Sequence, residues 1–324
     1  MNLKDLAKAV ATVKPNHSIL IYGQPGTGKT RLAGTAAKIR ALHRIFWFDI
    51  ENGVQTLLGM GLTDEELEKV ILIKIADTRD NPIGIETMLK ALTSKIPVSI
   101  CEKHGRVNCV ACAKDGSPSI SFLLSSLTHN DLVVIDSGSQ LGDSALAAAC
   151  LGKPDMYKPT FDEYGQVNKW LGDCMSVVQQ CANTNFVVIT HEIALEDDEG
   201  KDKFFPLIGS KQFSMKCAKY FGTRVYMHRK LNKHVGGSSS LYRGDVLAAS
   251  RVNAKLEEAK ELSMDAILVA TGILKEDGSE MVPSNKVIPI TPTAPVSEET
   301  KEAIANANKP LSLAERLALK KQKP

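Results

Sequence analysis

Short apolar runs rich in β-branched residues recur along the chain and predict the strands of a parallel sheet. They cover residues 18–22, 44–49, 70–75, 131–136 and 185–190. Runs of this length with few polar interruptions are typical of strands that are buried on both faces. Segments with apolar residues at helical spacing lie between them, at 30–42, 83–95 and 161–181. Strands that alternate with helices predict an α/β fold, with a mainly parallel sheet flanked by helices.

Weaker patterns predict a few further elements. A short amphipathic helix is expected at 3–13, and the capping box Thr63-Asp-Glu-Glu66 should begin another helical turn. Residues 224–228 and 245–249 are expected to pair as a hairpin around the loop at 236–240. Near the end of the chain, residues 311–321 fit a short basic helix.

Changes in composition divide the chain into three regions. Residues 1–96 and 120–275 carry the α/β pattern and are expected to form the core, whereas 97–119 is a Cys-, Gly-, Ser- and Lys-rich insert without periodicity. Residues 276–324 are rich in Pro and Thr and have little apolar surface to bury, which predicts a disordered linker and basic tail.

The composition excludes several classes of protein but does not indicate a particular binding partner. The 324 residues are 43% hydrophobic and carry a net charge of +3, which excludes fibrous and wholly disordered chains but builds no strong basic field. There is neither a signal-peptide pattern nor an apolar stretch approaching the 18 residues of a membrane span. Seven cysteines, an odd number, favour reduced thiols. We therefore expect a soluble cytoplasmic protein with no membrane partner.

A phosphate-binding loop directly follows the first predicted strand. The sequence Gly23-Gln-Pro-Gly-Thr-Gly-Lys-Thr30 satisfies G-x-x-x-x-G-K-[ST] in full and opens a helix, which is the context that this motif requires. Its backbone N–H groups should surround the phosphates of ATP, Lys29 should reach the terminal phosphates, and the Thr30 hydroxyl should ligate Mg²⁺. The predicted nucleotide-binding residues are Gly23, Gln24, Pro25, Gly26, Thr27, Gly28, Lys29, Thr30, Arg31 and Asp136.

Two carboxylates at strand ends complete this predicted site. Asp136 ends the strand Leu-Val-Val-Ile-Asp and is placed to hold Mg²⁺ together with Thr30. Glu51 follows the strand after the phosphate loop, where a carboxylate can position the attacking water. The structural alternative for Glu51 is an N-cap of the next helix, a role that Asp49 or Asn52 could fill equally well.

Four segments in order carry a family resemblance: GQPGTGKT, Trp47-Phe-Asp-Ile-Glu51, Val133-Val-Ile-Asp-Ser137 and Val187-Val-Ile-Thr-His-Glu192. Over residues 15–255 the chain resembles the RecA-like ATPase core, and within it the phage RecA-like single-strand annealing ATPases. The phosphate loop alone looks as much like that of an AAA+ enzyme. Such an enzyme would have its catalytic Glu directly after Asp136, where this chain has Ser137.

The resemblance also implies roles for residues after the fifth strand. His191 stands where RecA-like proteins carry a Gln that senses the γ-phosphate; the alternative is a surface His in a turn. Residues 194–213 take the place of a mobile DNA-binding loop, with Lys201, Lys203, Phe204, Phe205 and Lys211 as candidate contacts. Core packing of the two Phe residues is equally compatible. Cations that could reach a neighbouring subunit's nucleotide, or simply form a solvated edge, are Arg229, Lys230, Lys233 and Arg251.

The insert contains a separate set of metal-ligating residues. Cys101, His104, Cys109 and Cys112 lie within twelve positions and suit tetrahedral Zn²⁺. A small loop without a core needs such an ion to hold its shape, and four protein ligands leave no open position for catalysis. Scattered reduced cysteines are the alternative.

These inferences converge on a RecA-like ATPase with Glu51, Lys29 and His191 as its catalytic residues, and with ATP, Mg²⁺ and structural Zn²⁺ as its ligands. The resemblance implies DNA-stimulated hydrolysis in phage recombination, with single-stranded DNA, a single-strand-binding or replication/recombination protein and further copies of the chain as partners in the host cytoplasm. The alternatives are a replication accessory ATPase, such as a helicase or helicase loader, and a nucleotide-switched binding module.

Overall fold

The fold is described from a computed structural model that covers residues 18–181, 183–196, 200–230, 233–237, 245–250, 259–260 and 262–282. The chain divides into two compact units, Met1–Lys286 and Val287–Pro324, and every described residue belongs to the first. The helices expected at 3–13 and 311–321 and the candidate cation Arg251 lie outside the described residues. Of the tail expected to be disordered over 276–324, residues 276–282 are described, and Met281 there pairs with Leu274 and is buried.

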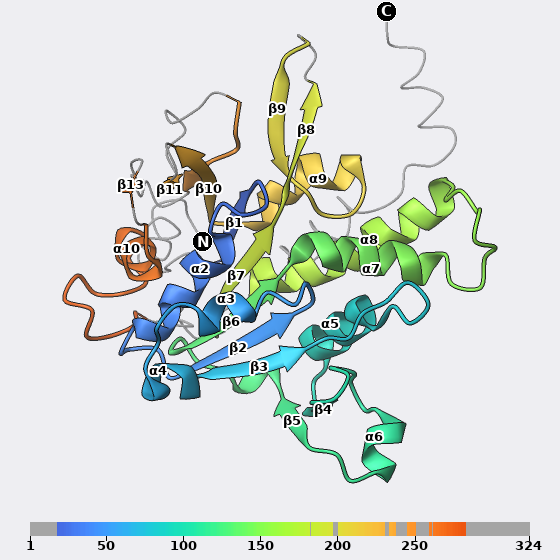
Figure 1. The fold of residues 1–324 in the computed structure, drawn as a ribbon, viewed down its shortest axis with the longest axis horizontal. Coiled ribbons are helices and arrows are strands. Elements are labelled where there is room, and N and C mark those ends of the chain that lie inside the picture. Colours follow the sequence, from blue (N-terminus) through green and yellow to red (C-terminus); the bar gives the residue numbers. More distant parts are fainter. Residues whose placement is uncertain are drawn as a thin grey trace, which may run out of the picture. The chain divides into compact units, whose positions relative to one another are not determined.

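A mainly parallel sheet forms the centre of the first unit (Figure 1). Its parallel strands lie side by side in the order β10, β1, β7, β6, β2 and β3. Their bounds are β10 (Thr223–Lys230), β1 (Ser18–Gly23), β7 (Asn185–Thr190), β6 (Asp131–Asp136), β2 (Arg44–Asp49) and β3 (Val70–Lys74). Antiparallel strands extend the β10 edge: β11 (Lys233–Gly237), β12 (Ala249–Ser250) and β13 (Ala259–Lys260).

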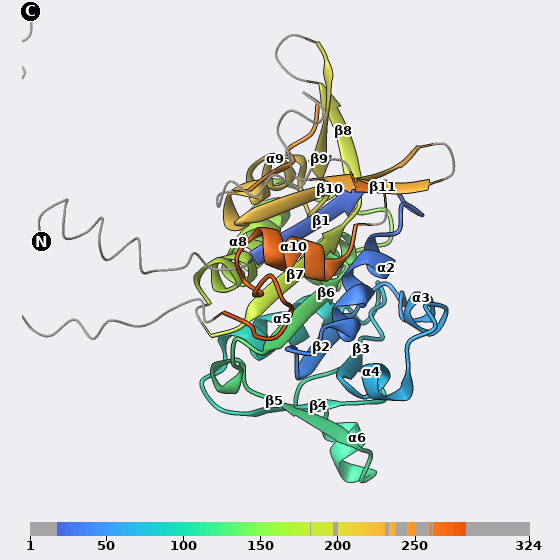
Figure 2. The ribbon, with the colours of Figure 1, turned by 90° about the vertical axis from the view of Figure 1, so that its left-hand side faces the viewer.

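Helices cover both faces of this sheet (Figure 2). One face packs on α5 (Ile83–Thr93), α7 (Gly138–Ala149), α8 (Phe161–Gln180) and α9 (Lys211–Cys217). The other packs on α2 (Lys29–Gly34), α3 (Gln55–Leu58) and α10 (Met264–Ala270). The remaining short helices are α4 (Asp64–Glu68), α6 (Val110–Lys114) and the 3₁₀ turns η1 (Thr35–Lys38), η2 (Leu124–Ser126) and η3 (Ala218–Tyr220).

Burial on both faces explains why the central strands read as unbroken apolar runs. In β1, Ile19 and Ile21 face the α2 side, whereas Leu20 and Tyr22 face the α5–α8 side, because successive side chains of a strand point to opposite faces. The predicted α/β class with a mainly parallel sheet is confirmed. So is the capping box at the start of α4, where the Glu66 amide donates to the Thr63 hydroxyl and the Thr63 amide to the Glu66 carboxylate.

Three regions differ from the sequence predictions. The insert is not irregular: β4 (Val98–Cys101) pairs with β5 (Ser119–Phe122), and α6 lies between them. The expected pairing of 224–228 with 245–249 is wrong for most of its length. β10 pairs with β11, which takes in residues 236 and 237 of the expected loop, and the later segment adds only the two-residue strand β12. The expected DNA-binding loop is also a hairpin, β8 (Glu192–Glu196) and β9 (Asp202–Pro206). Cross-strand contacts decided these pairings, and local propensity does not encode them.

Candidate active site

The phosphate loop joins β1 to α2 in a conformation that requires glycine. Gly26 and Gly28 have φ values of 74° and 88°, in the left-handed region that side chains disfavour. Gly23 is needed for space as well, because a Cβ atom there would lie 2.0 Å from the carbonyl oxygen of Met227 in β10. The sequence motif therefore forms a tight turn whose amides precede the N-terminus of α2, where an anion is stabilised.

Lys29 is the cation of this loop. Its Nζ donates to the carbonyl oxygens of Gly23 and Gln24 at 2.9 and 2.7 Å, and its residue is only 6% exposed. Burial lowers the pKa of Lys29 to about 8, against the opposing effect of the Glu51 and Asp136 carboxylates. The ammonium group is thus placed at the centre of the loop with negative charge close by.

Asp136 ends β6 as a buried carboxylate with an incomplete set of partners. It is 2% exposed, and no hydrogen-bond partner for its Oδ2 is present among the described residues. Burial raises the pKa of Asp136 to about 7; a hydrogen bond from Thr30 opposes this rise, and the charges of Asp49 and Glu51 add to it. An unpartnered buried carboxylate oxygen next to the Thr30 hydroxyl is a donor set that suits Mg²⁺.

Asp49, not Glu51, binds the start of the helix that follows β2. The Asp49 carboxylate accepts hydrogen bonds from the amides of Gly53 and Val54, at 2.8 and 3.2 Å. Gly53 leaves room for the neighbouring strand end, since a Cβ there would lie 2.9 Å from Asp136 Oδ2. Asp49 therefore takes the capping role that was the alternative for Glu51, and the Glu51 side chain points away from this helix.

Glu51 instead pairs with His191, which directly follows β7. Their Oε1 and Nε2 atoms lie 2.7 Å apart, and the other ring nitrogen of His191 is 3.5 Å from Lys29 Nζ. The hydrogen bond from His191 holds the pKa of Glu51 below its usual range, against the effect of burial, and a second hydrogen bond from Ser137 adds to this. Residues 29, 51 and 191, which are far apart in sequence, therefore meet at the carboxyl ends of β1, β2 and β7.

The backbone of His191 connects this group to the β8–β9 hairpin. Its amide donates to the Ser139 hydroxyl on α7 at 2.8 Å, and Ser139 donates to the Leu207 carbonyl oxygen, also at 2.8 Å. The Leu207 amide closes the loop by donating to the His191 carbonyl oxygen at 2.8 Å. Because Leu207 directly follows β9, both ends of the hairpin are fixed next to the His191 side chain. Ser139 was missed in the sequence, where an isolated serine on a helix carries no signal.

The other candidate contacts are distributed differently. Phe205 is 9% exposed, and Phe204 is half-buried and packs against the main core, so the core-packing alternative holds for both residues. Arg229 and Lys230 are exposed at the end of β10. Lys233 lines a cavity beside Gly28 of its own chain, a placement that the incorrect hairpin pairing concealed.

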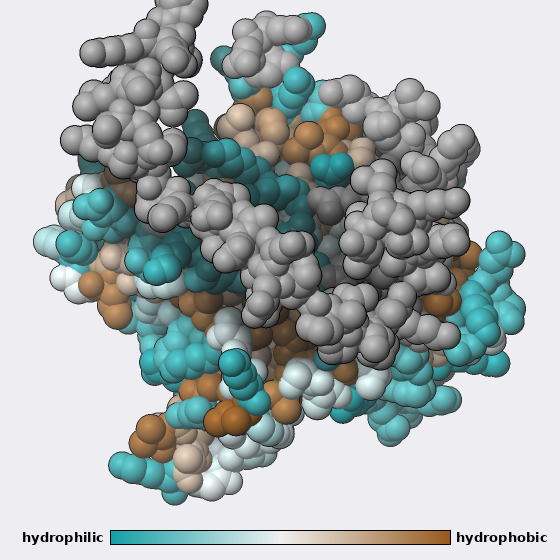
Figure 3. Space-filling model, turned by 180° about the vertical axis from the view of Figure 1, so that it is seen from behind, coloured by the Kyte–Doolittle hydropathy of each residue, from teal (hydrophilic) through white to brown (hydrophobic). Residues whose placement is uncertain are grey.

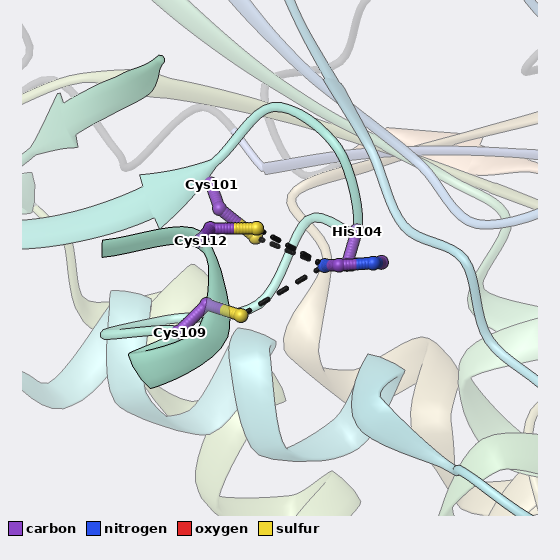
Figure 4. A group of neighbouring side chains, drawn as sticks. All are labelled: Cys101, His104, Cys109 and Cys112. Carbon is purple, nitrogen blue, oxygen red and sulfur yellow. Dashed lines mark hydrogen bonds between the residues drawn. The ribbon is translucent and has the colours of Figure 1, made fainter. Parts of the chain in front are cut away.

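The four predicted metal ligands of the insert converge in a separate cluster (Figure 4). The Nδ1 atom of His104 lies 3.8 Å from the sulfurs of Cys101 and Cys109 and 3.2 Å from that of Cys112. All four donor atoms lie within 4.8 Å of one another. Tetrahedral Zn²⁺, with Zn–S of about 2.3 Å and Zn–N of about 2.0 Å, separates its ligand atoms by roughly 3.5 to 3.8 Å, so the residues fit this ion.

The central sheet and the phosphate loop with its strand-end carboxylates define a P-loop nucleotide-binding ATPase. The protein family described as "AAA domain" matches residues 15–243, which is well over half of the chain. The chain therefore belongs to this AAA-domain family, and it is a P-loop ATPase. Ser137 follows Asp136, and Glu51 lies two residues after the end of the adjacent strand β2, as the RecA-like resemblance implied.

Solved structures with a similar fold include the RadB recombinase, at 15% identity and a TM-score of 0.38 over 79% of this chain and 91% of that chain. A prototypical ATPase from the type III secretion system of pathogenic bacteria has 17% identity and a TM-score of 0.40, over 81% and 65%. EscN from enteropathogenic E. coli has 15% and 0.39, over 69% and 46%. Because these TM-scores lie below 0.5, the assignment to the P-loop ATPases rests on the strand order and the family match. No curated protein matches the chain significantly.

Two further observations concern the expected cellular setting. Within the part of the chain that the structure describes, no helix combines the length and the apolar character that crossing a bilayer requires. All seven cysteines are free thiols.

Proposed function

We propose that this protein hydrolyses ATP to drive the binding and annealing of single-stranded DNA in phage recombination. The observation that carries the proposal is the hydrogen bond between Glu51 and His191 at the base of the β8–β9 hairpin. The His191 side chain reaches the carboxylate of the phosphate site, and its backbone holds Leu207 at the far end of the hairpin. A change at the γ-phosphate would therefore be transmitted to the β8–β9 hairpin through His191.

Each residue of the site has a role in this proposal. The loop amides and Lys29 bind the phosphates, Glu51 orients the attacking water, and His191 responds to loss of the γ-phosphate. Thr30 and Asp136 would hold Mg²⁺, which neutralises charge on the β- and γ-phosphates. The buried, unpartnered Oδ2 of Asp136 supports this assignment.

The β8–β9 hairpin would supply the DNA contacts. It projects from the sheet beyond the carboxyl end of β7 (Figure 1) and carries Lys201 and Lys203, with Lys211 exposed on the following helix. Phe204 packs against the core but is more exposed than Phe205, so it is the better candidate for base stacking. Glu196 and Asp202 lie on the same hairpin, so its lysines are interspersed with carboxylates.

Steady-state ATP hydrolysis with and without single-stranded DNA tests the proposal, with Lys29→Ala as the blank. Stimulation by DNA that disappears when Phe204 is replaced by Ala, but persists when the buried Phe205 is replaced by Leu, supports it. A basal rate that DNA leaves unchanged contradicts it and favours a protein client, as for a helicase loader. DNA or partner binding that survives in Glu51→Gln without turnover favours a nucleotide-switched binding module.

The proposal extends to partners and setting. The exposed cations Arg229 and Lys230 support a homo-oligomer in which one subunit reaches the nucleotide of the next. A single-strand-binding or replication/recombination protein would be a second partner, in the cytoplasm of the phage's host.

We also propose that Cys101, His104, Cys109 and Cys112 hold a structural Zn²⁺. The module they belong to projects from the sheet and has hydrophobic and hydrophilic residues intermixed on its surface (Figure 3). Its two strands bury Val98, Ile100 and Phe122 in the main core, so the ion would hold the outer part of the module around α6. It docks through the turn of His104 and Gly105. The Ala76 amide, just after β3, donates to the His104 carbonyl oxygen at 3.0 Å, and the buried Thr87 hydroxyl donates to that of Gly105 at 2.9 Å.

Metal analysis of the purified protein tests this site. One Zn²⁺ per chain is expected, falling to near zero in Cys109→Ser and remaining at one in Cys150→Ser, whose thiol lies outside the cluster. Substitution by Co²⁺ should give the visible bands of a tetrahedral thiolate site. Equal metal content in both variants would refute the assignment.

A further inference from the structure

Residues 245–250 form a strap that joins the β8–β9 hairpin to the central sheet. At one end of the strap, the Phe204 amide of β9 donates to the Asp245 carbonyl oxygen at 2.7 Å. Phe204 also forms a parallel bridge with Val246. At the other end, the last two residues of the strap pair with β10 as the short strand β12. The backbone of the strap is therefore fixed to both the hairpin and the central sheet.

The middle of the strap is held by Tyr22, the residue that directly precedes Gly23 of the phosphate loop. The Leu247 amide donates to the Tyr22 hydroxyl oxygen at 2.6 Å, although the two residues are 225 positions apart. Tyr22 is 0% exposed, and burial raises the pKa of its hydroxyl, so this group stays neutral. Because a buried polar group without a partner destabilises the protein, this hydrogen bond fixes the position of the strap relative to β1.

We propose that Tyr22 is a positioning residue whose hydroxyl transmits the nucleotide state of the phosphate loop through the strap to β9. The inference deepens the proposed function and rests on it, because the β8–β9 hairpin is the element proposed to contact DNA. It adds a second connection to that of His191, whose carbonyl oxygen binds the Leu207 amide at the base of the hairpin. The strap instead reaches the hairpin at Phe204, the residue proposed to stack on bases.

The two connections begin at neighbouring strand ends. Tyr22 pairs with Thr190 of β7, and Thr190 directly precedes His191. On the α5–α8 side of the sheet, Tyr22 belongs to the same core cluster as Val246 and Ala248 of the strap, which are 8% and 2% exposed. Because close-packed interiors transmit small displacements, a shift at the end of β1 moves the strap with it. Both connections are needed, since one holds the base of the hairpin and the other holds β9.

Amide hydrogen exchange with and without Mg²⁺ and a non-hydrolysable ATP analogue tests the inference in the absence of DNA. In the wild type, the analogue should change the exchange of β9 and of the Leu247 amide. Tyr22→Phe keeps the ring and removes the hydroxyl, so exchange at Leu247 without nucleotide should rise about tenfold, as for loss of one hydrogen bond. The change that the analogue causes in β9 should disappear. The Kd for the analogue should stay within about threefold, because the groups that bind the phosphates are unchanged.

Two further variants of the strap serve as a control and a cross-check. Ser250→Ala removes the hydrogen bond between the hydroxyls of Ser250 and Thr223, which are 3.0 Å apart on the β10 side of the strap. This bond does not lie between Tyr22 and β9, so the nucleotide-induced change in β9 should be retained. Leu247→Pro removes the donor of the bond whose acceptor is removed in Tyr22→Phe. The double variant should therefore lose no more of the change in β9 than either single variant.

Several outcomes would overturn the inference. A wild-type β9 that does not respond to the analogue, or a response that Tyr22→Phe retains, would mean that the bond is merely structural. Equal loss in Ser250→Ala, or additive losses in the double variant, would mean that the strap does not act through Tyr22. With DNA present, Tyr22→Phe should lower the ratio of stimulated to basal ATPase rate at least about twofold. Failure of DNA to stimulate the wild type would count against the proposed function only, since the exchange measurement contains no DNA.

Discussion

Replacing Asp136 by Asn should stabilise the protein in the absence of nucleotide and Mg²⁺, and the gain should grow with pH. Asp136 is buried between Asp49, Glu51 and Lys29, and its pKa rises from 3.8 to about 7. A raised folded-state pKa means that stability is greatest below pH 4 and is lost as the pH rises through 7. Asn has the shape of the neutral acid and avoids this loss, at the cost of the metal ligand.

The two pKa values set the size of the effect. The full shift of about 3 units corresponds to roughly 4 kcal/mol of unfolding free energy. At pH 5 the Asp136 carboxyl is already ionised in the unfolded chain and still neutral in the folded protein, so part of the difference in unfolding free energy is already present at this pH. Between pH 5 and pH 8 the stability of Asp136→Asn relative to the wild type should therefore increase by roughly 2 to 3 kcal/mol.

Urea unfolding at pH 5 and pH 8, followed by the fluorescence of the buried Trp47, measures this difference. Asp131→Asn is the matched control at the other end of β6. Burial raises the pKa of Asp131, but the hydrogen bonds from Arg44 and Thr128 outweigh burial and lower it overall. This group titrates below pH 5 in both states, so its replacement should destabilise the protein equally at both pH values.

Saturating Mg·ATP should reverse the order at pH 8, because ligand binding stabilises the wild type and far less the variant that lacks the metal ligand. A stability difference for Asp136→Asn that stays constant or shrinks from pH 5 to pH 8 would refute the reasoning. It would mean that burial does not disfavour the ionised form of Asp136 in the folded state, and that the site is not destabilised when no cation is bound.

Three other substitutions have expected outcomes at the same site. Glu51→Gln should lower kcat about 10²- to 10⁴-fold in single-turnover hydrolysis and keep ATP binding; a rate near that of the wild type would remove Glu51 from the chemistry. His191→Gln retains a hydrogen-bond donor for Glu51 and should keep the stimulation of the ATPase rate by DNA. His191→Ala should bring the ratio of stimulated to basal rate to one. Equal behaviour of the two variants would contradict a sensing role for His191. Gly53→Ala places a Cβ 2.9 Å from Asp136 Oδ2 and should raise the Mg²⁺ concentration that gives the half-maximal ATPase rate severalfold. An unchanged midpoint would show that the strand end adapts.

The sequence by itself determined the elements whose signal is local. The strands of the central sheet can be recognised in the sequence as apolar runs because both of their faces are buried. The phosphate loop can be recognised because its backbone geometry requires its glycines. The Cys/His cluster that could hold a metal ion also follows from spacing, since Cys101 and Cys112 lie within a single short module.

Tertiary structure decided what depends on contacts between distant segments. The pairing of Glu51 with His191 across 140 positions requires the strand order that puts β7 between β1 and β6. The partner of β10 and the position of His234 against Gly28 follow from strand pairing, which short strands with glycines specify only weakly. Likewise, only the tertiary structure shows that Phe204 packs against the main core and that Phe205 is 9% exposed, because packing depends on segments distant in the sequence.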